Sequence, residues 1–222
     1  MAGQVKSRER VQEHGEVFTN EREVNAMLDM VKQETERIDS RFLEPACGDG
    51  NFLSEVLRRK LAVVANRYSK SPHEYMRYTF VAVSSIYGVD IMPDNVAECR
   101  KRLFRIVEDA GHSAIGRSLD DSLLESVRYV LEKNILCGDA LTMVQHDGAP
   151  IIFAEWSMVM GDFVKRKDYR FDELLSGGDT KQGDQLGLFQ TGWEYDSEID
   201  GLIPSAIREY PPTDYREVSR NV

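Results

Sequence analysis

The sequence predicts an α/β fold with a mainly parallel β-sheet and helices on both of its faces. Three observations lead to this prediction. Strand and helix patterns alternate through the first part of the chain, a Gly-x-Gly turn stands between a strand and a helix, and another strand ends in an acidic residue. Because only about four strand patterns are present, we expect a sheet that is truncated after about four strands.

The elements before the second strand are each predicted by a local pattern. Asn20 and Glu23 have the spacing of a capping box, and apolar residues recur at helical spacing over 24–31. A short strand over 42–43 runs directly into the glycine segment. Residues 52–61 then place their apolar side chains on one face of a second helix.

The later elements continue the alternation. Pro72 marks the start of a helix, and Ile86–Asp90 has the pattern of a strand that ends in an acid. Pro93 opens another helix with one apolar face. The remaining patterns are a shorter helix over 123–131, a strand at 134–136 and a strand at 150–153. Crossover helices between strands imply parallel pairing, and ligands of such sheets bind outside the carboxyl ends of the strands.

The composition changes near residue 175. We therefore divide the chain into a folded domain over 1–175 and an acidic, glycine- and proline-containing tail over 176–222. The tail holds nine acidic and four basic residues, so it carries half of the formal net charge of −10. This composition favours loops or partial disorder. The apolar residues 186–189 and Trp193 suggest that the tail docks onto the folded domain or onto a partner.

The overall composition is that of a globular protein. Hydrophobic residues make up 41% of the chain and charged residues 30%. No apolar run approaches the roughly 18 residues of a membrane span, and the N-terminus lacks an apolar signal segment, so we expect a cytoplasmic protein without membrane contact. The three cysteines and four histidines show neither a disulfide framework nor metal-ligand spacing. We therefore expect no metal site.

The glycine turn is the first candidate for a binding site. Gly48 and Gly50 allow a tight turn and the close approach of a ligand, and the helix start near Asn51 offers unpaired N–H groups. Alone, this pattern fits a dinucleotide, a nucleotide or no ligand. Leu53 stands where the dinucleotide fingerprint has its third glycine, and Asp90 follows Gly50 by 40 residues rather than about 20. Both features argue against a dinucleotide.

Four segments resemble, in order, the motifs of adenine-N6-specific DNA methyltransferases, restriction-modification M subunits in particular. Residues 41–53, Arg-Phe-Leu-Glu-Pro-Ala-Cys-Gly-Asp-Gly-Asn-Phe-Leu, resemble motif I. Residues 15–20 resemble the N-terminal cofactor motif, with Phe-Thr-Asn where the family has Phe-Thr-Pro. Residues 87–91 resemble motif II, and residues 137–141 resemble motif III. The resemblance implies the Rossmann-like class I methyltransferase fold, with S-adenosylmethionine as the cofactor.

The resemblance also assigns roles to four acidic residues. Glu44 and Asp49 would accept hydrogen bonds from the ammonium group of the methionine part of the cofactor. Asp90 would bind both ribose hydroxyls through its two oxygens. Asp139 would accept from the adenine amino group, although a turn or cap role explains this residue as well.

Apolar and small residues complete the implied cofactor site. Ile91 would pack on the adenine ring. Phe18 and Thr19 would close the methionine side, while core packing alone is the other explanation of Phe18. The remaining residues expected at the cofactor are Pro45, Ala46, Cys47, Gly48, Gly50, Asn51, Phe52 and Ala140.

The catalytic loop of the resembled family is missing from its expected place. That family has Asn/Asp-Pro-Pro-Tyr/Phe after the fourth strand, where polar acceptors hold the amino group of a flipped-out adenine and the ring stacks on the base. Residues 154–159 read Ala-Glu-Trp-Ser-Met-Val instead. Glu155 and Trp156 are candidates for a divergent acceptor and stacking ring, but a strand-end carboxylate and a partly buried indole are the simpler interpretation. The segment 211–212 is a Pro-Pro without the preceding Asn or Asp.

Two functions remain open from the sequence. One is a DNA adenine-N6 methyltransferase whose missing parts come from a second chain or a second copy. The other is a catalytically inactive, S-adenosylmethionine-binding regulatory or decoy module derived from an M subunit. A methyltransferase for a small molecule or a protein fits motif I less well. DNA is the expected partner, although the chain is acidic, and the basic cluster over 165–167 could contact phosphates or form solvated surface.

Overall fold

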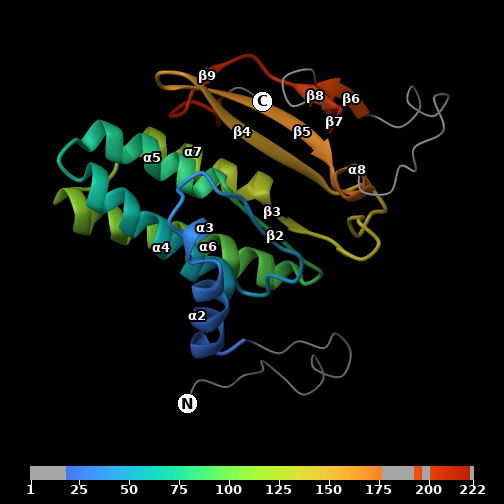
Figure 1. The fold of residues 1–222 in the computed structure, drawn as a ribbon, viewed down its shortest axis with the longest axis horizontal. Coiled ribbons are helices and arrows are strands. Elements are labelled where there is room, and N and C mark those ends of the chain that lie inside the picture. Colours follow the sequence, from blue (N-terminus) through green and yellow to red (C-terminus); the bar gives the residue numbers. More distant parts are fainter. Residues whose placement is uncertain (1–18, 177–192, 197–200, 221–222) are drawn as a thin grey trace.

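The computed structural model describes residues 19–176, 193–196 and 201–220 (Figure 1). The helices are α2 (Glu21–Met30), α3 (Lys32–Thr35), α4 (Asn51–Tyr68), α5 (Pro72–Ser84), α6 (Pro93–Ile115), α7 (Asp121–Asn134) and α8 (Phe171–Ser176). The strands are β1 (Phe42–Glu44), β2 (Ile86–Asp90), β3 (Ile135–Cys137), β4 (Ile152–Met160), β5 (Phe163–Arg170), β6 (Trp193–Asp196), β7 (Gly201–Pro204), β8 (Arg208–Glu209) and β9 (Thr213–Asp214).

Several helix starts follow the local rules from which they were predicted. Asn20 caps α2: its side chain accepts from the N–H of Arg22 at 3.0 Å, and the Glu23 side chain completes the predicted capping box. Ser71 is the N-cap of α5, and Pro72 occupies the first turn. Pro93 likewise begins α6. These starts were predictable because the signal lies within four residues of sequence.

A three-stranded parallel sheet forms the centre of the fold, in the order β1-β2-β3. Phe42 pairs with Ile86, and Gly88 pairs with Ile135, so all three carboxyl ends lie at one edge. This arrangement confirms a mixed α/β fold with a parallel sheet. One face of the sheet packs against the helices in the main hydrophobic core. The other face packs against the chain that follows β3, through a smaller cluster of buried residues: Tyr87, Val89, Ile151, Phe153 and Phe171. The prediction of helices on both faces was therefore wrong for the described residues, because the chain after β3 covers the second face in place of crossover helices.

The strand predicted over 150–153 is not a fourth parallel strand. It is the start of β4, which pairs antiparallel with β5 over its whole length. β4 and β5 pair antiparallel because the chain reverses directly between them at Gly161, which has a φ of 55°, whereas a parallel pair needs a crossover of a dozen or more residues. β8 and β9 then pair with the other side of β5, so β4 is an edge strand of this second sheet.

Part of the chain beyond residue 175 belongs to the main hydrophobic core. Tyr215 is fully buried, with its ring centroid 5.7 Å from that of Phe80, and Val218 is buried nearby in the same core. Figure 1 shows this segment, in red, lying along the β4–β5 hairpin. Residues 186–189, which were expected to dock, lie outside the described residues. No helix in the described ranges is long and apolar enough to cross a membrane.

Candidate functional site

The glycine turn between β1 and α4 has a backbone that requires its glycines. Gly48 and Gly50 have φ angles of 53° and 91°, a region that other residues rarely adopt. The N–H of Gly50 donates to the oxygen of Cys47 at 2.9 Å, and the N–H of Cys47 donates to Val89 on β2 at 2.9 Å. A Cβ atom on Gly50 would also stand 2.7 Å from the Sγ of Cys99 on α6. The turn is therefore fixed by main-chain hydrogen bonds, and it packs closely against α6.

Asp90, the last residue of β2, holds this turn through its side chain. Its Oδ2 accepts from the N–H of Gly48 at 2.9 Å. Its Oδ1 accepts from the N–H of Met92 at 2.9 Å and from the side-chain amide of Asn95 at 3.2 Å. The main-chain oxygen of Asp90 accepts from the N–H of Gly138 at 3.0 Å. The structure thus brings the segments after β1, β2 and β3 together at Asp90.

Asp139 lies after β3 in the geometry of a turn. Its Oδ1 accepts from the N–H of Leu141 at 2.8 Å, and these backbone hydrogen bonds lower the pKa of Asp139 below its usual range. The neighbouring Ala140 is half-buried, and Ile91 is 40% exposed beside the same strand ends. His146 contacts the main-chain oxygen of Ile91 at 2.9 Å. This geometry accounts for Asp139 as a turn residue, and it leaves the carboxylate at the surface.

The two other acidic residues of the turn differ in environment. Asp49 is 14% exposed, and its Oδ2 is 2.7 Å from a guanidinium nitrogen of Arg102, which also binds the side chain of Asn51. The Oδ1 of Asp49 is buried and has no hydrogen-bond partner among the described residues. Glu44 is half-buried, and burial raises its pKa, partly opposed by the N–H of Ala46.

The remaining predicted cofactor residues fall in three classes. Cys47 and Gly50 are buried, whereas Pro45 and Ala46 are exposed at the edge of the turn. Gly48, Asn51 and Phe52 are half-buried at the start of α4. Phe18 lies outside the described residues. Thr19 is exposed just before α2, and within the described part of the chain no hydrogen bond joins it to the turn.

The two residues considered for a base pocket do not share one. Alternate residues of β4 face opposite ways, so the Glu155 side chain lies toward β1 while Trp156 lies toward α7. Glu155 forms an ion pair with Arg41. Trp156 is 9% exposed, and its indole N–H donates to Asn134 at 3.0 Å. The Pro-Pro segment at 211–212 lies on the Trp156 side of the hairpin.

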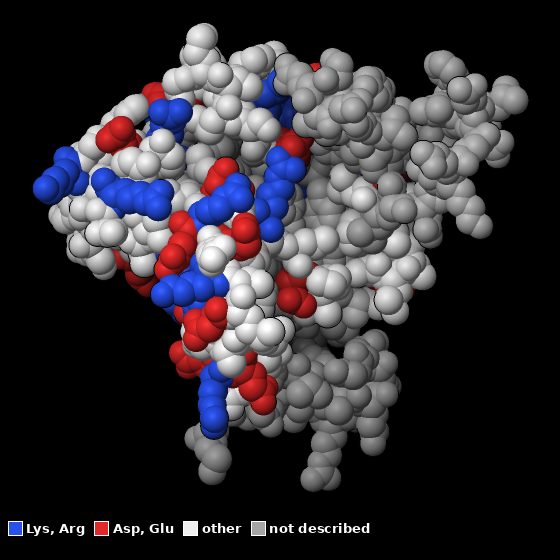
Figure 2. All heavy atoms as spheres, in the orientation of Figure 1, with Lys and Arg blue, Asp and Glu red and all other residues white. Residues whose placement is uncertain are grey.

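The basic cluster over 165–167 is compensated by acidic residues. Glu209 on β8 lies 2.6 Å from the ammonium nitrogen of Lys165 and 2.9 Å from that of Lys167, and these two lysines lower the pKa of Glu209 to about 2. Arg166 is buried, and its guanidinium binds both oxygens of Asp168, at 2.7 and 2.8 Å. Figure 2 shows acidic and basic side chains interspersed on one face of the molecule, without a continuous basic area.

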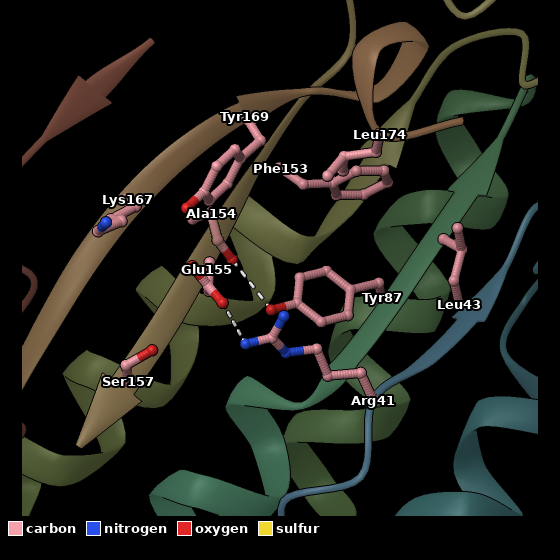
Figure 3. A pocket seen from close by; sticks show the side chains of 10 residues that line it. All are labelled: Arg41, Leu43, Tyr87, Phe153, Ala154, Glu155, Ser157, Lys167, Tyr169 and Leu174. Atoms are coloured by element: carbon pink, nitrogen blue, oxygen red, sulfur yellow. Dashed lines mark hydrogen bonds and ion pairs between the residues drawn. The ribbon is translucent and has the colours of Figure 1, made fainter. Parts of the chain in front are cut away.

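A cavity of about 520 Å³ lies between β1, β2 and the β4–β5 hairpin (Figure 3). Arg41, Tyr87 and Tyr169 line it together with Glu155. The first three could not be predicted as site residues, because this cavity forms only where the hairpin brings Glu155 to Arg41, 114 positions away in the sequence. Among the described residues, no group of three or more His, Cys, Asp or Glu side chains is arranged to hold a metal ion.

Two curated proteins are similar to this chain over part of its length. DNA methyltransferase A of Bacillus subtilis (strain 168) is 24% identical over 164 residues, which cover 70% of this chain and 18% of that protein. The adenine-specific methyltransferase PglX of Streptomyces coelicolor (strain ATCC BAA-471 / A3(2) / M145) is 31% identical over 102 residues, which cover 46% of this chain and 8% of that protein.

These similarities, with the glycine turn and the parallel sheet, support a methyltransferase family. The matched region spans less than a fifth of the length of either relative. No protein-family model matches the chain, and no solved structure matches it.

Proposed function

We propose that this chain binds S-adenosylmethionine and forms the cofactor-binding part of a DNA adenine-N6 methyltransferase. The observation that carries the proposal is the convergence on Asp90, whose side chain holds the N–H of Gly48 and whose main chain holds the N–H of Gly138. A fixed glycine turn beside a strand-end carboxylate suits a ligand that carries hydroxyl and ammonium groups. The similarity to the two methyltransferases supports the same conclusion.

The described residues fit this cofactor. The unpartnered, buried Oδ1 of Asp49 would gain a hydrogen bond from the methionine ammonium group. The carboxylate of Asp90 accepts from the main-chain N–H groups of Gly48 and Met92 and from the side-chain amide of Asn95. An ionised carboxylate accepts about four hydrogen bonds, so we propose that it also accepts one from a ribose hydroxyl. The exposed Ile91 offers an apolar surface for the adenine ring. When bound, the cofactor supplies the methyl group for transfer to an amino nitrogen.

We further propose that methyl transfer to DNA requires a second, different chain. Glu155 and Trp156 lie on opposite sides of β4, so they do not form a base pocket together. The cluster over 165–167 holds three cations that are paired with two carboxylates, Glu209 and Asp168, so it offers only a small basic footprint for the backbone of a DNA duplex. The same two observations favour the second candidate, a catalytically inactive cofactor-binding module.

Calorimetric titration with S-adenosylmethionine and S-adenosylhomocysteine tests the cofactor site. We expect binding by the wild-type chain and a dissociation constant that rises about tenfold or more in Asp49→Asn, since the negative charge opposite the ammonium group is lost. Asp109→Asn, an exposed acid on α6, is the matched control and should bind like the wild type. Absence of binding by folded wild-type protein would overturn the proposal.

Transfer of labelled methyl groups to unmethylated DNA distinguishes the two functions. We expect cofactor binding without incorporation by the chain alone, and incorporation after addition of a chain that carries an Asn/Asp-Pro-Pro-Tyr/Phe loop. Incorporation by the chain alone, lost in Asp49→Ala, would contradict the need for a partner. Cofactor binding that never leads to incorporation would favour the inactive module.

A further inference from the structure

The cavity beside the Arg41–Glu155 pair is separate from the glycine turn. It contacts β2 at Tyr87, whereas Asp90 ends that strand three residues later, about 10 Å further along. Its volume of about 520 Å³ lies within the range of small-molecule sites. The proposed methyltransferase function does not use this cavity.

The walls of the cavity are aromatic and held in place. Tyr87 and Phe153 meet edge to face, with ring centroids 5.5 Å apart and an interplanar angle of 86°. The hydroxyl of Tyr87 donates to the main-chain oxygen of Ala154 at 3.1 Å. Phe153 also packs edge to face on Phe171, at 5.2 Å. Tyr169 is the cross-strand partner of Phe153 and extends this surface, and Figure 3 shows its ring over the same opening. The aromatic wall is therefore held in one arrangement by contacts within the protein.

The mouth of the cavity holds two cations, Arg41 and Lys167, and each of them is paired with a carboxylate. The Arg41 side chain is 58% exposed, while its partner Glu155 is only 23% exposed. The ion pair fixes the guanidinium and engages only some of its five N–H donors. Lys167 lines the same cavity from β5 and is held by Glu209 at 2.9 Å. A phosphate at this mouth would meet a bidentate donor and an ammonium group.

We propose that this cavity binds a nucleotide unit, with the base on the aromatic wall and the phosphate at Arg41 and Lys167. Aromatic stacking beside fixed cations is the general chemistry by which proteins hold single nucleotides of a strand. Leu43 and Leu174 supply apolar contact on the remaining sides of the ring. The site is distinct from that of the methyl donor and does not depend on whether the chain binds that donor.

The first test is calorimetry of the full chain with 2′-deoxyadenosine 5′-monophosphate. Deoxyadenosine and inorganic phosphate serve as the two half-ligands. We expect the nucleotide to bind more tightly than either half, because ring and phosphate are held together. Saturation with S-adenosylhomocysteine should leave nucleotide affinity unchanged. Absence of nucleotide binding, or its displacement by S-adenosylhomocysteine, would overturn the proposal; neither result would bear on methyl-donor binding, which is measured separately.

Two pairs of variants assign the binding to the cavity. Tyr169→Leu should raise the dissociation constant of the nucleotide at least fivefold, since a stacking ring is lost. Arg41→Gln, paired with Glu155→Gln to avoid an unpaired carboxylate, should weaken the nucleotide but not deoxyadenosine. The controls are Tyr68→Leu, whose ring stacks on Tyr78 away from the cavity, and Arg220→Gln. Equal affinities in cavity and control variants would overturn the proposal.

A cross-linking experiment on the wild-type chain locates the site without variants, and so also tests the proposal if the variants fold poorly. A single-stranded oligodeoxynucleotide carrying 5-iododeoxyuridine is irradiated with the wild-type chain, and the cross-linked peptides are identified by mass spectrometry. We expect cross-links on peptides from β4 or β5 that contain Phe153 or Tyr169. Cross-links found solely on other peptides would overturn the proposal.

Discussion

Lys60 is a fully buried lysine under the start of the parallel sheet. Its ammonium nitrogen donates to the main-chain oxygens of Ile38, at 3.0 Å, and Ser40, and it lies 2.7 Å from the Oγ of Ser85. It therefore joins α4 to the chain that enters β1 and to the junction of α5 and β2. Burial lowers the pKa of Lys60 to about 7, because the charged form loses its hydration.

This lowered pKa predicts a pH-dependent stability. The unfolded chain keeps the lysine proton to about pH 10, whereas the folded chain releases it near pH 7. The unfolded state thus binds more protons between these values, so stability should rise with pH across this window, by up to about 1.4 kcal/mol per pH unit. Urea unfolding at several pH values checks this. Lys60→Met should flatten the profile, and parallel profiles for the two proteins would contradict the assignment.

Gly88, in the middle of β2, is required by close packing rather than by its φ angle. A Cβ atom there would stand 2.9 Å from Leu53 and 3.0 Å from the Cβ and Sγ of Cys47 in the glycine turn. Gly88→Ala should cost about 1–3 kcal/mol of stability through overpacking and should also weaken cofactor binding. Gly116→Ala is the control: its Cβ meets nothing within 4 Å, so only backbone strain is added. Equal cofactor affinity in both variants would refute the link to the turn.

At the scale of elements, the β4–β5 hairpin connects the parallel sheet to the chain beyond residue 200. Arg166 is central to this connection. Its guanidinium binds Asp168 on the same strand and the hydroxyl of Tyr129 on α7, at 2.6 Å. It also lies 4.3 Å from the ring centroid of Tyr210. One buried cation therefore contacts its own strand, α7 and the segment that follows β8.

Removal of one member of the buried Arg166–Asp168 pair should lower the free energy of unfolding. Arg166→Met leaves the carboxylate of Asp168 buried without its cation, and we expect a loss of about 3–5 kcal/mol. In Arg166→Met/Asp168→Leu, both charges are gone, so much of the stability should return. Chemical denaturation of the wild type and the variants gives these values. A double variant less stable than the single one would show that the pair itself stabilises the hairpin.

The elements that could be predicted from the sequence are those with local signals. The capping box at Asn20, the prolines that begin α5 and α6, and the strand Ile86–Asp90 all agree with the structure. The pairing of β4 could not be predicted in this way, because alternating burial is compatible with a parallel or an antiparallel neighbour. Within the site, the sequence predicted which strand ends meet, but the cavity at Arg41 depends on a contact between distant segments.

At the scale of the whole molecule, the main core draws on both ends of the described chain. Val24 and Leu28 of α2 lie in the same cluster as Tyr215 and Val218. The composition of residues 176–222 predicts an acidic tail. Composition does not indicate, however, that a few apolar residues of this segment complete the core. The free energy of unfolding therefore depends on residues within the segment that the charge pattern indicated as a tail.

Tyr215 provides the test of this dependence. Its ring is fully buried, but its hydroxyl is buried without a hydrogen-bond partner among the described residues. Tyr215→Ala should therefore cost about 3–5 kcal/mol, whereas Tyr215→Phe should be neutral or stabilising. Thermal unfolding of the two variants checks this prediction. Similar losses in both would show that the hydroxyl, rather than the ring, is what the core needs.

The hydrogen bond from Tyr87 to Ala154 also bears on how this protein behaves at high concentration. The main-chain oxygens of Arg166 and Asp168 bond to the chain at β8, so the carbonyl of Ala154 points to the open side of β4. Nine-residue edge strands are templates for pairing with other chains. The hydroxyl of Tyr87 occupies one main-chain acceptor of this edge, the oxygen of Ala154, and the Arg41–Glu155 ion pair lies beside it. Together they interrupt the row of groups with which another strand could pair. We therefore expect the same two side chains that frame the cavity, Tyr87 and Arg41, to oppose edge-to-edge pairing at β4.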